Sequence, residues 1–380
     1  MLGHPLGPLP VATGGADWED MAYEMNQLLQ ICMDQNASDI HITVGRPPSF
    51  RISGSIKSLK SPALTPEDTI GLMKQITSER GQTEIAEVGS TDFAIAFEDK
   101  ARFRVNVFKQ KQKVALVLRL IPSKILTMDE LGLPPLIKDI ATRPRGLVLV
   151  TGPTGSGKST SLAAMIDFIN SEEDGHIITL EDPIEFTHNH KKCVVNQREI
   201  HVDCPSFEEG LRRSLREDPD VILVGEMRDL ATISAAISAA ETGHLVFGTL
   251  HTTGASRTVD RIIDVFPTDQ QEMVRTQLAG NLVAVISQAL VPKIPKGRVA
   301  AYEIMIMNAA ISNLIRENKS FRIDSTIQTS ANQGMILLDD SLYKLYTAGT
   351  ITFDNMMTFA KDVNYLQRKV QEAGTAPKAP

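Results

Sequence analysis

Residues 146–160, GLVLVTGPTGSGKST, constrain the fold of this chain more than any other stretch. Residues 146–150 form a short apolar run of the length of a buried parallel strand, and a glycine-rich turn follows them. The spacing G-x-x-x-x-G-K-[ST] is that of a phosphate-binding loop, in which glycines let backbone N–H groups point into one concavity. A chance glycine turn is the alternative, but strand, loop and helix follow one another in the order that phosphate binding needs.

The residues after the glycines favour a nucleotide with a metal ion. A helix that starts at about Lys158 adds the positive end of its dipole to the loop. Lys158 is placed to reach the β- and γ-phosphates, and the Ser159 hydroxyl to bind Mg²⁺. We therefore predict a nucleotide site formed by Gly152, Pro153, Thr154, Gly155, Ser156, Gly157, Lys158, Ser159 and Thr160.

Bulk composition fits an ordinary globular protein. The 380 residues suggest two or three domains, and 42% hydrophobic and 22% charged residues are average values. A net charge of −7 argues against nucleic acid as the main partner. No apolar run approaches the roughly 18 residues that span a bilayer, and the N-terminus lacks a signal-peptide pattern.

The cysteines fit a reducing cytosol. Their number, three, is odd, and no C-x-x-C is present. One cluster of metal-binding residue types has a spacing that matches no standard zinc finger, so a hairpin with incidental histidines is favoured over a metal site. It consists of His188, His190, Cys193, His201 and Cys204.

The N-terminal third reads as a small α+β domain. Residues 1–20 are rich in Gly and Pro and are predicted to be a disordered tail or a leader. Within 21–121, short segments alternate apolar and polar residues, and residues 100–120 look like a hairpin. Three prolines in 122–135 indicate a linker.

The predicted hairpin is basic: seven Lys or Arg and no acid lie between Lys100 and Arg119. One interpretation is a solvated strand edge that resists aggregation. The other is that Arg104 or Arg119 reaches a phosphate across a domain or subunit boundary. Composition alone leaves both open.

Residues 136–370 alternate strand and helix, which predicts an α/β domain with a parallel sheet. The predicted strands are 146–150, 176–182, 220–226, 244–251 and 298–305. The predicted helices include 158–170, about 207–216, 228–242, 256–263 and 268–290. Residues 371–380 are predicted to be a tail.

Two strands end in acids, where ligands of open α/β sheets lie. Strand 176–182 runs into Glu181, Asp182 and Glu185, and one of these carboxylates can orient an attacking water. Strand 220–226 ends in Glu226, at the place where the Walker B acid, usually Asp, holds Mg²⁺. A solvated acidic turn in the first case, and coincidence in the second, are the alternatives.

Strand 244–251 carries a histidine at each end. The two ends are about 23 Å apart at roughly 3.3 Å per residue, so both histidines cannot touch one phosphate. His251, at the carboxyl end, is the better candidate for sensing a γ-phosphate, whereas His244 suits a structural or interface role. A lone histidine is more often a satisfied structural residue.

Five motifs in order resemble a known family. They are SDIHI (38–42), GPTGSGKST (152–160), ITLEDPIEF (178–186), ILVGEMRD (222–229) and HLVFGTLHT (244–252). With this set the chain resembles the secretion ATPases of the type II/type IV pilus class, and within them the PilT-type pilus retraction ATPases. The similarity spans about 22–370, and the ordered set is specific although no single motif is.

The resemblance implies an α/β chain with an N-terminal PAS-like α+β domain, followed by a RecA-like P-loop ATPase domain. It implies a cytoplasmic homo-hexamer that hydrolyses ATP with Mg²⁺ and acts on an inner-membrane pilus platform protein within the pilus machinery. It gives catalytic roles to Glu185 as the activator of water, Glu226 as the Walker B acid, the His-box residues His244 and His251, and the arginines Arg104 and Arg119.

Two features concern the branch of the family. The tetracysteine zinc motif of assembly-type members is absent from the sequence, which favours the retraction branch. In 310–317, AISNLIRE, Ser312 replaces an arginine of the family's AIRNLIRE motif and removes one charge. An accessory or paralogous pilus ATPase is therefore an alternative. A nucleic-acid translocase and a nucleotide-gated scaffold are alternatives of other classes.

Overall fold

A computed structural model describes residues 23–52, 54–98, 100–121 and 124–373. The chain divides into two compact units, Met1–Lys124 and Ile125–Pro380. Residues 1–20, predicted as a tail, and residues 374–380 of the predicted tail 371–380 lie outside the described residues. Residues 371 and 372 belong to the last helix, which ends at Glu372.

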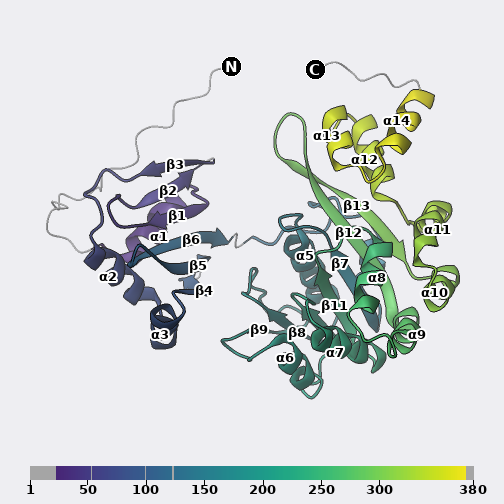
Figure 1. The fold of residues 1–380 in the computed structure, drawn as a ribbon, viewed down its shortest axis with the longest axis horizontal. Helices are drawn as coiled ribbons and strands as arrows, with labels where there is room; N and C mark the ends of the chain where they lie inside the picture. The colour runs from purple at the N-terminus through teal and green to yellow at the C-terminus, as the bar shows by residue number, and fades with distance from the viewer. Residues whose placement is uncertain (1–22, 53, 99, 122–123, 374–380) are drawn as a thin grey trace. The chain divides into compact units, whose positions relative to one another are not determined.

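The first unit is a six-stranded antiparallel sheet with helices packed on one face (Figure 1). Alternate residues of the strands, such as Phe103 and Val105, are fully buried beneath Leu28 and Leu72 of the helices. The strand order is β3-β2-β1-β6-β5-β4. The elements are α1 Met25–Asp34, β1 Asp39–Ile42, β2 Ser49–Ile52, β3 Ser55–Ser58, α2 Pro66–Ile76, α3 Glu79–Glu87, β4 Ser90–Phe97, β5 Ala101–Gln110 and β6 Lys113–Ile121.

The second unit has a seven-stranded sheet of order β13-β12-β7-β11-β10-β8-β9. All neighbours are parallel except the β12–β13 pair. The strands are β7 Gly146–Thr151, β8 His176–Glu181, β9 Val194–Glu199, β10 Val221–Val224, β11 Leu245–Leu250, β12 Leu282–Pro292 and β13 Arg298–Ile306. This order places the phosphate loop, after β7, between β11 and β12.

Helices cover both faces of this sheet, so its central strands are buried on both sides. Leu147 and Leu149 face one apolar cluster, and Val148 and Val150 face the other. Met128 and Leu133, within the predicted linker 122–135, are buried in the second cluster. The helices up to β12 are α4 Leu136–Ala141, α5 Lys158–Glu172, α6 Phe207–Ser214, α7 Leu230–Glu241, α8 Ala255–Asp264 and α9 Gln271–Asn281.

The predicted helix 268–290 is wrong in its second half. Helix α9 ends at Asn281, and β12 begins at the next residue. β12 pairs with β7 on one side and β13 on the other, so it is buried through most of its length. A run that is apolar on both faces shows no strand alternation, and its β-branched Val285 and Ile286 were the signal for a strand.

The C-terminal helices follow the β12–β13 hairpin, and the later ones among them pack beside it (Figure 1). They are α10 Ala309–Arg316, α11 Ile323–Thr329, α12 Leu338–Thr347, α13 Phe353–Phe359 and α14 Val363–Glu372, with short 3-10 turns η1 Ser320–Arg322 and η2 Ala331–Gln333. A buried cluster that includes Val291, Leu342 and Leu366 joins α12–α14 to the hairpin, whereas α10 packs against α9 and α11 against α8.

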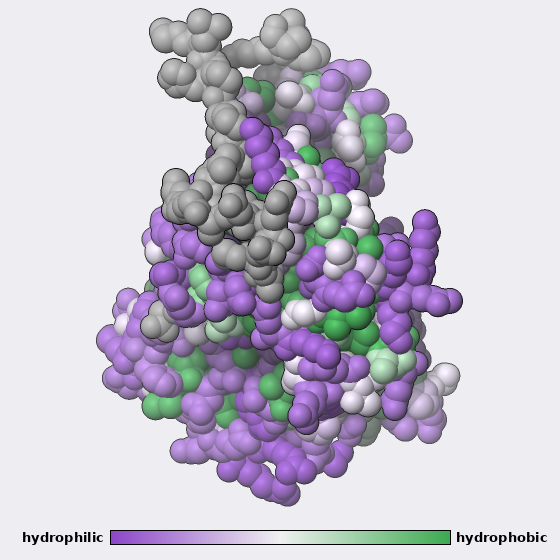
Figure 2. Space-filling model, turned by 90° about the vertical axis from the view of Figure 1, so that its left-hand side faces the viewer, coloured by the Kyte–Doolittle hydropathy of each residue, from purple (hydrophilic) through white to green (hydrophobic). Residues whose placement is uncertain are grey.

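Within the described ranges, none of the helices has the length and apolar character needed to cross a lipid bilayer. Hydrophilic residues predominate on the surface that Figure 2 draws, with hydrophobic residues among them in smaller groups.

Candidate active site

The phosphate loop leaves β7 near the middle of the second sheet and ends in α5. All six residues of β7 are buried, which fixes the start of the loop. Gly157, with φ 92°, is the N-cap of α5 and makes no side-chain cap. The first N–H groups of the helix are therefore available to an anion. Ser159 is exposed in the first turn, where its hydroxyl is able to bind Mg²⁺.

Close packing against β12 requires glycine in this loop. A Cβ on Gly152, which has φ 141°, would lie 2.3 Å from the carbonyl oxygen of Gln288 and 2.7 Å from Ser156 Oγ. A Cβ on Gly157 would lie 2.8 Å from Gln288 Nε2. The buried Gln288 is fixed in turn by Ser161, whose Oγ donates to Gln288 Oε1 at 2.8 Å. Because glycine has no side chain, the loop backbone stays accessible at these positions, and phosphates are able to approach it.

Lys158 folds over the loop and lies near two acids. Its Nζ donates to the carbonyl oxygens of Gly152 at 2.8 Å and Pro153 at 3.2 Å. Burial lowers the pKa of Lys158, and the negative charges of Glu226 and Glu185 offset only part of that effect. The charges of Glu226 and Glu185 therefore both act on this ammonium. Binding of phosphate oxygens by this partly desolvated ammonium would replace its backbone acceptors with charged ones.

Glu226 and His251 meet because β10 and β11 are parallel neighbours. Nε2 of His251 donates to Glu226 Oε1 at 2.7 Å, and Arg228 pairs with the same carboxylate. Burial alone would raise the pKa of Glu226, but Arg228 and then His251 outweigh it and lower that pKa. Glu226 is therefore ionised at neutral pH and fits the role of an acid that holds Mg²⁺ through water.

These residues line one pocket with the phosphate loop. The pocket has a volume of about 650 Å³, within the usual range of roughly 300–1,000 Å³ for small-molecule sites. Its wall includes Thr154 of the loop, Glu226, His251, Thr252 and Arg261. The glycine cradle, the uncapped α5 and the ionised Glu226 together fit a nucleotide with Mg²⁺.

The turn that carries Glu185 is held by Gln197. Gln197 Nε2 donates to Glu181 Oε1 at 3.1 Å and to the carbonyl oxygen of Phe186 at 2.7 Å, and its Oε1 accepts from His188 N at 2.7 Å. These bonds fix residues on both sides of Glu185 in the sequence: Glu181 before it, and Phe186 and His188 after it. Glu181 Oε1 also accepts from Thr179 Oγ1 at 2.6 Å, and burial raises the pKa of Glu181.

The role of Gln197 depends on β9. The sequence predicted only a hairpin in this region, whereas β9 is a single strand parallel to β8. This parallel partner of β8 is the short segment VVNQRE, which pairs Gln197 with Thr179. Two adjacent valines were the available signal for a strand. The contact of Gln197 with the acidic turn arises from sheet pairing, and nothing in the local pattern indicates it.

His244 lies at the opposite end of β11 from His251. Its Nδ1 is 2.9 Å from the carbonyl oxygen of Ala239, at the C-terminus of α7. The structure therefore separates the two histidines, as the strand length predicted, and leaves His244 outside the pocket of Glu226.

Arg104 and Arg119 are cross-strand neighbours on the first sheet. They pair directly in the β5–β6 register, and both are exposed. Arg119 Nε donates to the buried Asp39 at 2.9 Å, and Arg51 lies 3.5 Å from the same carboxylate. Burial would raise the pKa of Asp39, but Arg119 and Ser38 lower it. The two arginines thus lie on one unit and the phosphate loop on the other.

The histidine–cysteine cluster is spread over separate contacts. Cys193 Sγ donates to the carbonyl oxygen of Glu173 at 3.0 Å, and the buried Cys204 lies against α6. Among the described residues, His, Cys, Asp and Glu side chains form no group of three or more with the arrangement of a metal site.

Comparisons with known proteins assign the family. A family model described as type II/IV secretion system protein matches residues 16–357. The chain belongs to this family. It is 51% identical to the type IV pilus retraction ATPase PilT of Pseudomonas aeruginosa, over 89% of this chain and 98% of the relative. A twitching motility protein of Neisseria gonorrhoeae is 48% identical over 87% of this chain and 89% of its own length.

The solved structures agree with this assignment to the type II/IV secretion system family. A crystal structure of the pilus retraction motor PilT with bound ADP matches 91% of this chain and 99% of its own chain. The TM-score is 0.86 at 50% identity. The resemblance predicted from the five motifs is thereby confirmed, together with a mixed α/β fold containing two sheets.

In this member of the type II/IV secretion system family, Ser312 is a packed residue. It lies on α10 and is buried, and its Oγ donates to the carbonyl oxygen of Ala279 at 3.0 Å. Ala279 is in the last turn of α9, whose carbonyls lack intrahelical partners. Ser312 therefore joins α10 to the end of α9.

Proposed function

We propose that this chain is the subunit of a Mg²⁺-dependent ATPase motor that drives type IV pilus retraction and twitching motility. One observation carries the proposal: Glu226 and His251 line one pocket with Thr154 of the phosphate loop, at the carboxyl ends of the parallel strands. The names of its relatives, a pilus retraction ATPase and a twitching motility protein, support the biological role.

The residues divide the work of hydrolysis. Lys158 and the loop N–H groups bind the β- and γ-phosphates, and Glu185 orients and deprotonates the attacking water. Glu226 and Ser159 would hold Mg²⁺, which would neutralise phosphate charge when bound. His251, through its bond to Glu226, lies where loss of the γ-phosphate is sensed.

The proposed architecture is a PAS-like domain at 21–121, a linker at 122–135 and a RecA-like domain at 136–370. Six copies form a ring in which Arg104 and Arg119 approach nucleotide from across a domain or subunit boundary. The γ-phosphate then connects two bodies, and its loss releases them. The exposure of Arg104 and Arg119 on one face of the first unit supports this role.

The proposed location is the cytoplasmic side of the inner membrane at the pilus base. The partner is the inner-membrane platform protein of the pilus machinery, which the motor contacts as a peripheral protein. The pilus-related names of the relatives support this placement.

A phosphate-release assay tests the enzymatic part. We expect Lys158→Ala to abolish turnover and Glu185→Gln to lower kcat by ~10²–10⁴ while ATP still binds, because a general base contributes about that factor. Near wild-type turnover by Glu185→Gln overturns the assignment of the base. Tight ATP binding by the wild type without phosphate release indicates the nucleotide-gated scaffold instead.

Subunit mixing tests the arginines. Lys158→Ala and Arg104→Ala proteins, each inactive alone, should regain activity when mixed, because one retains the arginine and the other the nucleotide site. A protein that is monomeric with and without ATP excludes this arrangement.

Two further measurements distinguish the alternative functions. Salt-dependent binding of single-stranded DNA supports a translocase. Hydrolysis without restored twitching in a retraction-deficient strain supports an accessory paralogue.

A further inference from the structure

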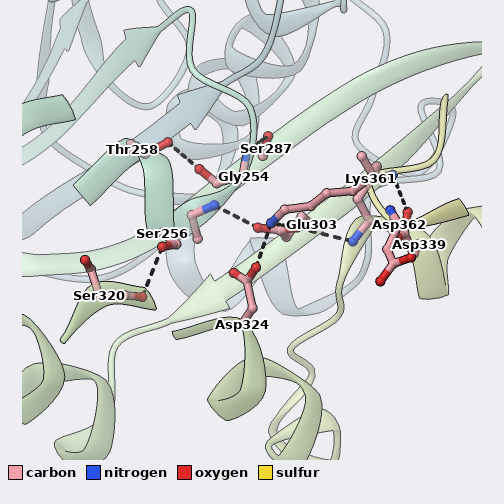
Figure 3. A network of polar contacts seen from close by, with 12 residues as sticks. Gly254, Ser256, Thr258, Ser287, Glu303, Ser320, Asp324, Asp339, Lys361 and Asp362 are labelled. Atoms are coloured by element: carbon pink, nitrogen blue, oxygen red, sulfur yellow. Dashed lines mark hydrogen bonds and ion pairs between the residues drawn. The ribbon is translucent and has the colours of Figure 1, made fainter. Parts of the chain in front are cut away.

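The loop that follows His251 is fixed from outside the nucleotide site. Gly254 N donates to Ser287 Oγ of β12 at 2.9 Å (Figure 3). Ala255 N donates to Glu303 Oε1 of β13 at 2.7 Å. His251 and Thr252 at the start of this loop line the pocket with Glu226. Two strands that do not carry the phosphate loop residues thus determine where one wall of the pocket lies.

Glu303 caps the helix that begins at this loop. The N-cap of α8 is Gly254, which provides no side-chain acceptor, and the Glu303 carboxylate takes that place. A negative charge is favourable at a helix N-terminus. Its second oxygen accepts from Leu338 N, at the start of α12, at 3.4 Å. A single carboxylate, only 1% exposed, therefore joins α8 to the C-terminal helices.

Lys361 supplies the charge that this buried carboxylate needs. Its Nζ lies 3.7 Å from Glu303 Oε2 and 2.8 Å from Asp324 Oδ2 of α11 (Figure 3). Burial would lower the pKa of Lys361, but the charges of Glu303 and Asp324 raise it, so the ammonium stays protonated.

The backbone of Lys361 is fixed as well. The amides of Lys361 and Asp362 donate to the two carboxylate oxygens of Asp339 at 2.7 and 2.8 Å. Gly254 fits beneath the pair without spare room: a Cβ there would lie 3.1 Å from Lys361 Nζ and 3.2 Å from Glu303 Oε1. A shift of the Lys361 side chain would therefore displace the loop at Gly254.

We propose that Glu303 and Lys361 are positioning residues through which the C-terminal helices α11–α14 hold the His251 loop in the geometry that ATP hydrolysis requires. The inference deepens the proposed function and rests on it. It assigns to the C-terminal helices a direct effect on the wall of the pocket at His251, and it predicts that a force on those helices changes discrimination between ATP and ADP.

A purely structural role is the competing explanation, and buried ion pairs are weak evidence for stability. The test therefore uses Glu303→Gln, Lys361→Met and the double variant in the full chain. Lys369→Met is the matched control, because Lys369 also belongs to this C-terminal segment and has a raised pKa, but its Nζ pairs with Asp340 and Tyr365 instead of Glu303. Thermal stability is measured for every variant.

The first readout is amide hydrogen exchange of the peptide covering 252–258, which does not depend on activity. We expect exchange in this peptide to rise ~10-fold in Glu303→Gln and in Lys361→Met, and not in Lys369→Met, because local opening becomes easier where its anchor is lost. The double variant should exceed neither single by more than about twofold, since both substitutions break one unit.

The second readout is nucleotide binding and turnover. We expect kcat to fall ~10-fold and the affinity for a non-hydrolysable ATP analogue to fall, with ADP affinity within about twofold of wild type, because ADP lacks the phosphate nearest this wall. Equal changes in Lys361→Met and Lys369→Met, or unchanged exchange at 252–258, overturn the inference. If Glu303→Gln does not fold, Lys361→Met alone decides, because this lysine is partly exposed.

Failure of the proposed function gives a different result. A wild type that releases no phosphate from ATP refutes the motor, whereas the exchange pattern still decides whether the two residues fix the loop.

Discussion

His251 Nε2 donates to Glu226 Oε1 at 2.7 Å, across the carboxyl ends of two neighbouring parallel strands. A histidine on the nucleotide side of the sheet is thereby held against the acid that is proposed to carry Mg²⁺. The contact joins Glu226, which follows β10, to His251, at the start of the loop that leads into α8.

The first prediction concerns this pair. His251→Ala should lower kcat by ~10–100-fold, because an interaction with developing charge is lost, while ADP affinity changes less than about threefold. Steady-state kinetics and titration with a fluorescent ADP analogue check it. His244→Ala is the control, because His244 lies at the other end of β11 and does not contact Glu226. An equal loss of kcat in both variants would contradict a specific role of the Glu226 contact.

The second prediction concerns Gln197, which holds the turn of Glu185. Gln197→Leu should lower kcat about tenfold with ATP affinity retained, because a small misplacement of the base is costly. The double variant Glu185→Gln/Gln197→Leu should be no slower than Glu185→Gln alone, since Gln197 acts through Glu185. Additive losses would show that Gln197 acts elsewhere.

The third prediction compares two glycines of the phosphate loop. Gly152→Ala should abolish ATP binding, because its Cβ would lie 2.3 Å from the Gln288 carbonyl oxygen. Gly155 has φ 78°, but a Cβ on this residue would meet nothing within 4 Å. Gly155→Ala should therefore cost only the backbone strain, about 1–2 kcal/mol of unfolding free energy, and retain measurable binding. Isothermal titration and chemical denaturation distinguish the two variants.

The fourth prediction concerns pH and His188. Burial lowers the pKa of this histidine from 6.5 to about 4. The unfolded chain then binds a proton between these pH values and the folded chain does not, so its contribution to stability is present above pH 6.5 and is lost as pH falls toward 4. The loss is about 3 kcal/mol at 1.4 kcal/mol per pKa unit.

Urea denaturation between pH 7 and pH 4.5 measures this effect. The stability of His188→Gln should fall less steeply with acid than that of the wild type. Parallel slopes for the wild type and His188→Gln would refute the assignment.

Local signals were sufficient for the parts of the site that lie at strand ends. The phosphate loop, Glu226 and His251 each follow an apolar run, and a parallel sheet brings all such ends to one edge. The sequence also predicted the separation of His244 from His251, because a strand has a fixed rise per residue. The family was predicted from five ordered motifs and is confirmed.

Local signals failed where a residue acts through sheet pairing. Residues 282–290 were predicted as helix, although they form β12, because an apolar run buried on both faces carries no period. The segment of β9 was predicted only as part of a hairpin, whereas it is a single strand parallel to β8. With these two strands missing, the supports that Gln197 and Gln288 give to the site were not predictable.

The sequence by itself determined the chemistry of this protein: a bare glycine loop with a lysine, and acids placed after buried strands, because those properties depend on neighbouring residues in the chain. Only the tertiary structure decided which side chains hold that chemistry in place. Gln197, Gln288 and Glu303 reach the site across hydrogen-bonded strands and a helix terminus, and such contacts depend on distances between segments that no local pattern encodes.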